Sequence, residues 1–172
     1  MTTAALLAGH GLRITLPDRW EGRLYLRAAL PSAEVRPAVL DVHPVAFGWP
    51  EERPNPVLHL ANFALPPGRG DFGTGAVETM GERHAFLSLF EYGAEEVGRA
   101  LFAARGMPRP VARDFASNQL QRHVAGQLGC QRFFTEKGRA FCLYIVLGSQ
   151  RHAVSLVQEV HEALAQLQVE QR

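Results

Sequence analysis

Apolar and polar residues follow two different periods in the last third of the chain. Residues 130–135 and 140–147 are rich in aromatic and β-branched side chains, which favour strands. Gly138 lies between them, where a tight hairpin turn needs a positive φ angle. The pattern predicts an antiparallel hairpin. Its second strand is apolar on both alternating faces, so we expect it inside a sheet that is covered on both sides.

Helical spacing begins after Gly148-Ser149. Apolar residues then recur every three or four positions while polar residues fill the opposite face. The apolar positions are Val154, Leu156, Val157, Val160, Leu164 and Leu167. Ser149 belongs to the residue types that commonly cap a helix N-terminus. We expect one long amphipathic helix at the C-terminus, packed on the sheet.

Further strands are predicted earlier in the chain. Residues 11–17 and 23–27 alternate polar and apolar positions and predict an N-terminal hairpin. Residues 57–65 and 85–92 have the composition of two more strands. A helix is expected at residues 93–105, before Gly and Pro residues end it.

The remaining segments carry weaker patterns. Prolines interrupt residues 31–56, where only a short strand at 38–42 is expected, and a short helical piece is expected at 76–81. No segment repeats, so residues 1–172 are predicted to form a single domain, with residues 1–10 open to disorder. The predicted fold class is α+β: an antiparallel sheet of five or more strands with helices packed on it.

Composition excludes several classes of protein. The 172 residues suffice for one hydrophobic core, and 18 basic and 17 acidic residues give a net charge of +1. The charges are scattered, so neither nucleic acid nor an anionic membrane is an expected partner. The longest apolar run, residues 140–147, is far shorter than the ~18 residues needed to cross a bilayer, and the N-terminus lacks the features of a signal peptide. We therefore expect a soluble, cytoplasmic protein.

Residues 68–73 match Gly-x-Gly-x-x-Gly, a pattern found in dinucleotide-binding loops. Two prolines separate it from the preceding strand, and residues 74–81 are too short and glycine-broken for a crossover helix that would bind a pyrophosphate. We interpret the stretch as a mobile surface loop, with no bound cofactor. The tripeptide Arg69-Gly70-Asp71 within it resembles an adhesion motif and is most simply a coincidence.

Other reactive side chains lack catalytic spacing. The seven histidines (10, 43, 59, 84, 123, 152 and 161) form no metal-ligand pattern, so we expect solvated or capping histidines and no metal. Ser88 and Ser149 lack the glycines of a nucleophile elbow. We interpret Glu91, Glu95 and Glu96 as a solvated helix start.

The two cysteines depend on the length of the hairpin turn. A two- or four-residue turn would place Phe133 opposite Cys142 and put Cys130 and Cys142 on opposite faces of the sheet. A three-residue turn would bring both to one face. Free buried thiols are the expected state.

One family has a similar arrangement. The opening from Gly11 to Trp20, the pair Phe133-Phe134, the stretch Gly138-Arg139-Ala140-Phe141 and the closing helix resemble PsbP-like domains, in particular small actinobacterial ones. This superfamily joins the photosystem II extrinsic protein PsbP, the Mog-type Ran-binding proteins and many bacterial proteins. The resemblance implies an α/β/α sandwich and a binding or accessory module without catalytic residues. Its members are often tethered outside the membrane, whereas for this chain we expect no signal and no lipid-attachment cysteine.

The leading hypothesis is therefore a non-catalytic binding or adaptor module whose partner is another protein. Its expected contact surface is the 66–75 loop or the Pro-rich 31–56 segment, because long loops commonly carry function. The candidate contact residues are Arg69, Asp71, Phe72 and Trp49. Two alternatives stay open. The loop aromatics could instead pack back on the sheet, and the protein could be a small-molecule-binding protein or enzyme with a pocket between sheet and helices.

Overall fold

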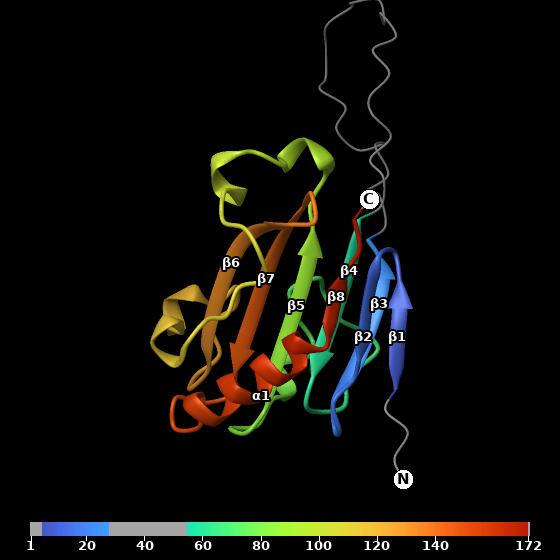
Figure 1. Ribbon diagram of the computed structural model, residues 1–172. Coiled ribbons are helices and arrows are strands. Elements are labelled where there is room, and N and C mark those ends of the chain that lie inside the picture. The colour runs from blue at the N-terminus through green and yellow to red at the C-terminus, as the bar shows by residue number, and fades with distance from the viewer. Residues whose placement is uncertain (1–4, 28–54, 172) are drawn as a thin grey trace, which may run out of the picture.

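The computed structural model describes residues 5–27 and 55–171, which form an α+β fold of two antiparallel sheets and one α-helix (Figure 1). The large sheet has the strand order β3 (Glu21–Leu26), β4 (Pro56–Ala61), β5 (Ala85–Glu91), β7 (Arg139–Leu147) and β6 (Leu128–Glu136). The small sheet has the order β1 (Leu6–Gly9), β2 (Leu12–Thr15) and β8 (Leu167–Val169). The helix α1 spans Ala153–Ala165. No helix among these residues is long and apolar enough to cross a membrane.

The predicted β6–β7 hairpin is confirmed. Its last pair is Glu136 with Arg139, so the turn has two residues, Lys137 and Gly138, with φ angles of 51° and 73°. Positive φ at both positions is the signature of a type I′ turn. Phe133 lies opposite Cys142, which puts the two thiols on opposite faces, and both cysteines are free and buried. Every residue of β7 is buried between β5 and β6, as its apolar pattern predicts.

Different layers cover the two faces of the large sheet. The face that we call the helix face carries Leu58, Leu87 and Leu143, which form one core with α1 and β2. In Figure 1, α1 and β8 lie in front of this face. The opposite face, which we call the loop face, carries His59 and Phe86 and is covered by connecting segments rather than by an α-helix of the described chain.

The predicted N-terminal hairpin is wrong. β2 pairs with β1 and with β8, while β3 pairs with β4 in the other sheet. The cause is local, because His10 and Gly11 both have positive φ and form a two-residue turn that folds β1 onto β2. Part of the stretch 1–10 that was open to disorder is therefore the strand β1.

The C-terminal helix is confirmed but is shorter than predicted. Ser149 is not the N-cap, since α1 begins at Ala153, although the Ser149 hydroxyl accepts the N–H of His152 at 3.3 Å. Val154, counted among the apolar positions, is 76% exposed. Leu167 lies beyond the helix, in the strand β8.

The helix predicted at residues 93–105 is also wrong. Two short 3₁₀ helices, η2 (Ala94–Glu96) and η3 (Ala100–Phe102), replace it, because Gly98 adopts a φ of 89° between them. The short helical piece at 76–81 is confirmed as η1 (Val77–Thr79). Two further 3₁₀ helices are η4 (Ala112–Asp114) and η5 (Ser117–Gln119). The short strand expected at residues 38–42 lies outside the described residues.

A buried ion pair joins the two sheets. Arg139, at the start of β7, donates from Nε and Nη2 to the two carboxylate oxygens of Glu91 on β5, at 3.0 and 2.7 Å. Both side chains are almost completely buried, 1% and 3% exposed. The same guanidinium donates to the carbonyls of His10, Gly11 and Glu170, at 2.9, 2.8 and 3.2 Å. One side chain therefore holds the β1–β2 turn and the end of β8 onto the large sheet.

Replacing Arg139 with Met should lower the free energy of unfolding by about 3–5 kcal/mol, because the guanidinium that neutralises the buried Glu91 carboxylate is lost. The double variant Arg139→Met, Glu91→Gln should be more stable than Arg139→Met alone, since the buried charge is gone. Urea denaturation followed by circular dichroism measures both. A loss below 1 kcal/mol for Arg139→Met would contradict this role.

Candidate functional site

The 66–75 loop is fastened to the loop face by His59. This histidine is on β4 and is completely buried. Its Nδ1 accepts a hydrogen bond from Arg69 Nε at 3.1 Å, and its Nε2 lies 2.8 Å from the carbonyl oxygen of Asp71. Because an arginine nitrogen can only donate and a carbonyl can only accept, His59 is the neutral tautomer with its proton on Nε2.

Asp71 is the second centre of this network. Its carbonyl also accepts from the Ser88 hydroxyl at 2.6 Å. Its carboxylate accepts from the Tyr25 hydroxyl at 3.0 Å and lies 3.2 Å from Arg27 Nε. Arg69 further donates to the carbonyl of Pro66. Both charged residues of the Arg-Gly-Asp tripeptide are thus used to hold the loop.

Close packing reinforces these hydrogen bonds. Phe72 stacks on Phe90 with ring centres 5.6 Å apart and meets the edge of Tyr144 at 5.7 Å. Gly73 has a φ of 87°, and a Cβ at this position would overlap the ring of Phe86. The glycine pattern thus serves a tight backbone approach to the sheet. The mobile surface loop expected from the sequence does not fit this packing, and Phe72 packs back on the sheet, as the alternative had it.

Burial sets the protonation of the network. Desolvation lowers the pKa of His59 to about 4, with the nearby Arg69 charge acting in the same direction. Burial, followed by the hydrogen bond to Asp71, raises the pKa of Tyr25. The histidine is therefore neutral near pH 7, and it is neither solvated nor a cap, which corrects the expectation from the sequence.

The network does not have the geometry of a nucleophile and base. The Ser88 hydroxyl and His59 Nε2 both donate to the same carbonyl, so neither activates the other. Burial raises the pKa of Cys130 and of Cys142 to about 11, which keeps both thiols protonated. Within residues 5–27 and 55–171, no group of three His, Cys, Asp or Glu side chains could hold a metal ion.

Glu91 does not belong to a solvated helix start. It is 2% exposed and binds Arg139 on the helix face, whereas Glu95 and Glu96 lie on the exposed η2 segment. The expectation of one solvated group is therefore wrong for Glu91.

Phe72 of the docked loop and three half-buried aromatic residues of the large sheet and its ends form one cluster. Tyr25, Phe72, Tyr92 and Phe133 pack around the buried side chains of Val57, Phe90 and Cys142. Arg27 lies over the Phe90 ring, with its guanidinium carbon 5.2 Å from the ring centre. We call the four half-buried residues, together with Arg27, the aromatic surface. It contains Phe72 and adjoins Arg69 and Asp71, whereas Trp49 lies outside the described residues.

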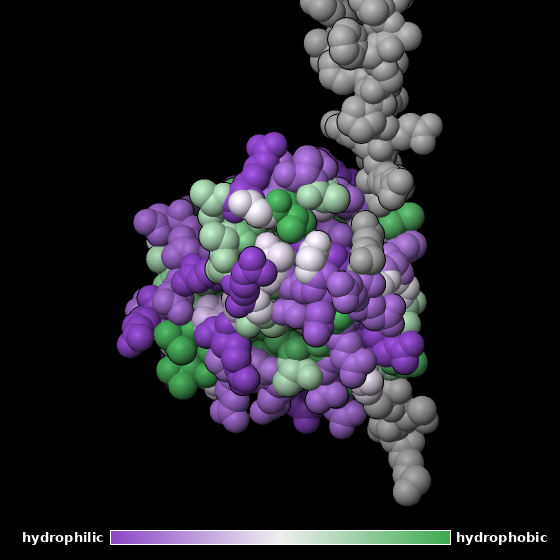
Figure 2. Space-filling view, turned by 45° about the horizontal axis from the view of Figure 1, so that its top comes forward, coloured by the Kyte–Doolittle hydropathy of each residue, from purple (hydrophilic) through white to green (hydrophobic). Residues whose placement is uncertain are grey.

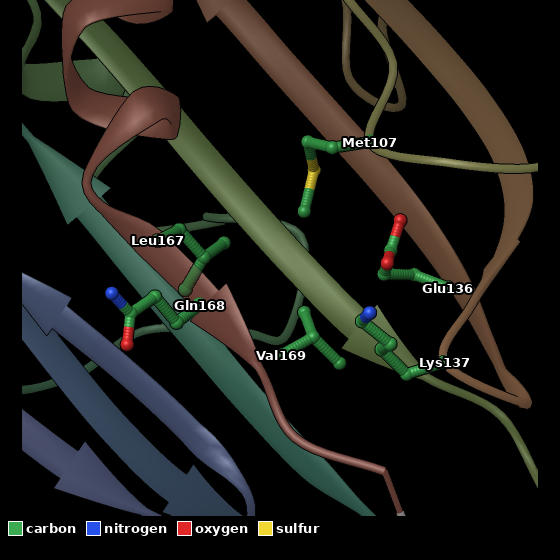
Figure 3. A pocket seen from close by; sticks show the side chains of 6 residues that line it. All are labelled: Met107, Glu136, Lys137, Leu167, Gln168 and Val169. Carbon is green, nitrogen blue, oxygen red and sulfur yellow. The ribbon is translucent and has the colours of Figure 1, made fainter.

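A separate hollow lies on the other side of the molecule, next to β8 (Figure 3). It has a volume of about 300 Å³ and is lined by Met107, Glu136, Lys137, Leu167, Gln168 and Val169. A smaller hollow of about 140 Å³ shares Met107 and reaches α1 at His161, Leu164 and Ala165. Of these two hollows, the smaller one reaches the helix, where the small-molecule alternative places its pocket.

Sequence reasoning missed His59, although one signal was present. A single polar residue interrupts the apolar strand sequence Val57-Leu58-His59-Leu60, and the alternation of a strand places it on the same face as Val57 and Ala61. Its partners, ten and twelve residues later, could not be identified without the path of the loop.

Replacing His59 with Gln should remove an acid sensitivity of the fold. Between about pH 6.5 and pH 4 the unfolded chain protonates His59 and the folded one does not, so the wild type loses about 3 kcal/mol as pH falls through this window. Gln can still accept from Arg69 and donate to Asp71, but it does not titrate.

Urea denaturation at pH 7, 5.5 and 4 measures the free energy of unfolding of wild type and variant. Relative to the variant, the wild type should lose about 3 kcal/mol between pH 7 and pH 4. Parallel pH profiles for the two proteins would show that His59 titrates normally in the folded state.

Comparison with protein-family models, with curated proteins and with solved structures finds no match to this chain. The resemblance to PsbP-like domains therefore stays a prediction.

Proposed function

We propose that this protein is a non-catalytic binding module that contacts another protein through the aromatic surface and the docked 66–75 loop. The observation that carries the proposal is the buried His59 network, which fixes the loop so that Phe72 completes a row of half-buried aromatic side chains. Such a surface is formed before the partner arrives.

The composition of the surface supports protein binding. Aromatic residues and Arg are enriched at the centres of protein interfaces and account for much of their binding energy. Tyr25, Tyr92 and Phe133 are each only half-buried, and Arg27 and Asp71 form a charged pair next to them. Because ring contacts already restrict these side chains, ordering them on binding should cost little entropy.

We further propose that the fold is a PsbP-like sandwich. A PsbP-like sandwich is supported by the antiparallel large sheet, by the late β6–β7 hairpin and by the helix α1 that follows it. The role of a binding or accessory module agrees with that assignment. The cytoplasmic location expected from the sequence remains a prediction.

The test replaces aromatic residues that do not hold the loop. The double variant Tyr92→Ala, Phe133→Ala should lose roughly 30-fold or more in affinity for the partner, because two anchor side chains are removed. Arg69 and Asp71 are unsuitable because they bind His59. The matched control is Val154→Ala, an exposed apolar residue on α1.

The protein would be immobilised and exposed to a lysate of its source organism, and the affinity of each captured protein would then be measured by calorimetry. A partner that binds wild type and Val154→Ala but not the double variant supports the proposal, provided that the variants melt cooperatively. Capture of a partner equally by the double variant, or of no specific partner, contradicts it.

A further inference from the structure

The strand β8 has an open edge. The N–H of Glu170 donates to the carbonyl of Gly11 at 2.9 Å, so these residues form a hydrogen-bonded pair of the antiparallel ladder. Hydrogen-bonded and non-hydrogen-bonded pairs alternate along such a ladder, which makes the next pair, Leu12 with Val169, non-hydrogen-bonded. The N–H and C=O of Val169 therefore point away from β2. Leu167 has the same parity and the same orientation.

The outer edge of the large sheet, at β6, is covered, in contrast to the edge of β8. Connecting segments close it. Ala116 and Gly129 exchange two hydrogen bonds of 3.0 Å, the N–H of Thr135 donates to the carbonyl of Ala104 at 2.8 Å, and the carbonyl of Thr135 accepts from the N–H of Gly106 at 3.0 Å. Protein folds commonly cover or block sheet edges in this way, because an open edge can pair with another chain. At β8 the structure places a hollow instead of a covering segment.

This hollow lies directly along the open edge. Figure 3 shows Leu167 and Val169 on β8 facing Met107, with Lys137 and Glu136 from the β6–β7 turn at the far end. The volume of about 300 Å³ is enough for a few side chains. Beyond Met107 the smaller hollow adds Arg109. Two cationic side chains and one carboxylate thus line the two hollows, which favours an occupant with a negative charge.

Among the described residues, the face of the molecule seen in Figure 2 has no large continuous apolar patch. On the face turned toward the viewer in Figure 2, hydrophilic side chains cover most of the surface and hydrophobic ones lie in small, separate areas. At the open edge of β8, the groups that lack a hydrogen-bond partner in the described part of the chain are the backbone N–H and C=O of Leu167 and Val169. Their natural complement is another extended backbone.

We propose that the open edge of β8 binds an extended, acidic segment of a partner polypeptide as an added strand. The backbone of the segment pairs with Leu167 and Val169. One of its apolar side chains enters the hollow beside Met107, and an acidic residue contacts Lys137. This site is distinct from the aromatic surface and does not depend on its function.

The backbone geometry suggests two proline variants with opposite expectations. Val169→Pro removes an N–H that points to the open edge, so it should leave the fold intact, whereas Gln168→Pro removes one that pairs with Arg13 on β2 and should destabilise it. Val169→Ala is the matched control for the side chain, because it keeps the N–H. Thermal melts of the three variants check the orientation of β8 before any ligand is added.

The binding test uses a phage-displayed library of random dodecapeptides selected on the wild-type protein. The selected peptides should alternate apolar and polar residues and include Asp or Glu. They should lose roughly tenfold or more in affinity for Val169→Pro, but clearly less for Val169→Ala. The Tyr92→Ala, Phe133→Ala variant should bind them as wild type does, which separates this site from the aromatic surface.

Lys137 offers an independent readout because it is the only lysine of the chain. A bound peptide should protect it from acetylation by an amine-reactive ester, as measured by mass spectrometry, and Lys137→Glu should weaken acidic peptides. A library that yields no binder, peptides that bind folded Val169→Pro as well as Val169→Ala, or unchanged acetylation of Lys137 would each overturn the proposal.

Discussion

The ion pair between Arg139 and Glu91 is the contact on which the arrangement of the two sheets depends. The five hydrogen bonds that Arg139 donates reach three separate parts of the chain: β5, the β1–β2 turn and the end of β8. A buried charge pair is stabilising only when its geometry is good and its remaining donors are satisfied, and the guanidinium of Arg139 meets both conditions. Gly11 contributes to this, because a side chain there would meet the guanidinium.

Two type I′ turns meet at this point. His10-Gly11 and Lys137-Gly138 each reverse the chain with two residues of positive φ, and Arg139 follows the second turn directly. The Lys137-Gly138 turn therefore determines the backbone position of Arg139, and Glu91 determines the direction in which its side chain points. Since β8 is held at its end by the same group, the open edge that lies beside the hollow is also positioned by it.

On the loop face a neutral buried side chain, His59, has a role similar to that of Arg139. His59 is buried without charge and connects β4 to the 66–75 loop, which Tyr25, Ser88 and the packing of Phe72 also hold on the sheet. Buried polar groups need partners, and here every partner belongs to the loop or to a neighbouring strand. The two candidate binding surfaces, one on each side of the large sheet, are thus both formed by elements that buried polar side chains hold in place.

The sequence predicted the parts that depend on local pattern. Gly138 and the flanking aromatic runs were sufficient for the β6–β7 hairpin, and the helical spacing of Leu156, Val160 and Leu164 was sufficient for α1. The possible lengths of the hairpin turn also left two registers for the strands, and one of them puts the two cysteines on opposite faces of the sheet.

The parts that depend on distant partners could not be predicted. β8 has only three residues, too few for a period, and Leu167 continues the spacing of the helix, so it was assigned there. Glu91 and Arg139 are 48 positions apart, and the pairing of β5 with β7 is needed to bring them together. The candidate site was predicted in part, since Arg69, Asp71 and Phe72 lie at the docked loop, but their tie to His59 required the fold.

Arg139 joins the two sheets into one cooperative unit. Native-state hydrogen exchange measures this directly, residue by residue, as the free energy of opening. We expect the amides of β2 to exchange with the same opening free energy as the amides of β5 and β7 in the wild-type protein. Exchange of β2 through an opening several kcal/mol less costly, with β5 and β7 still protected, would contradict it.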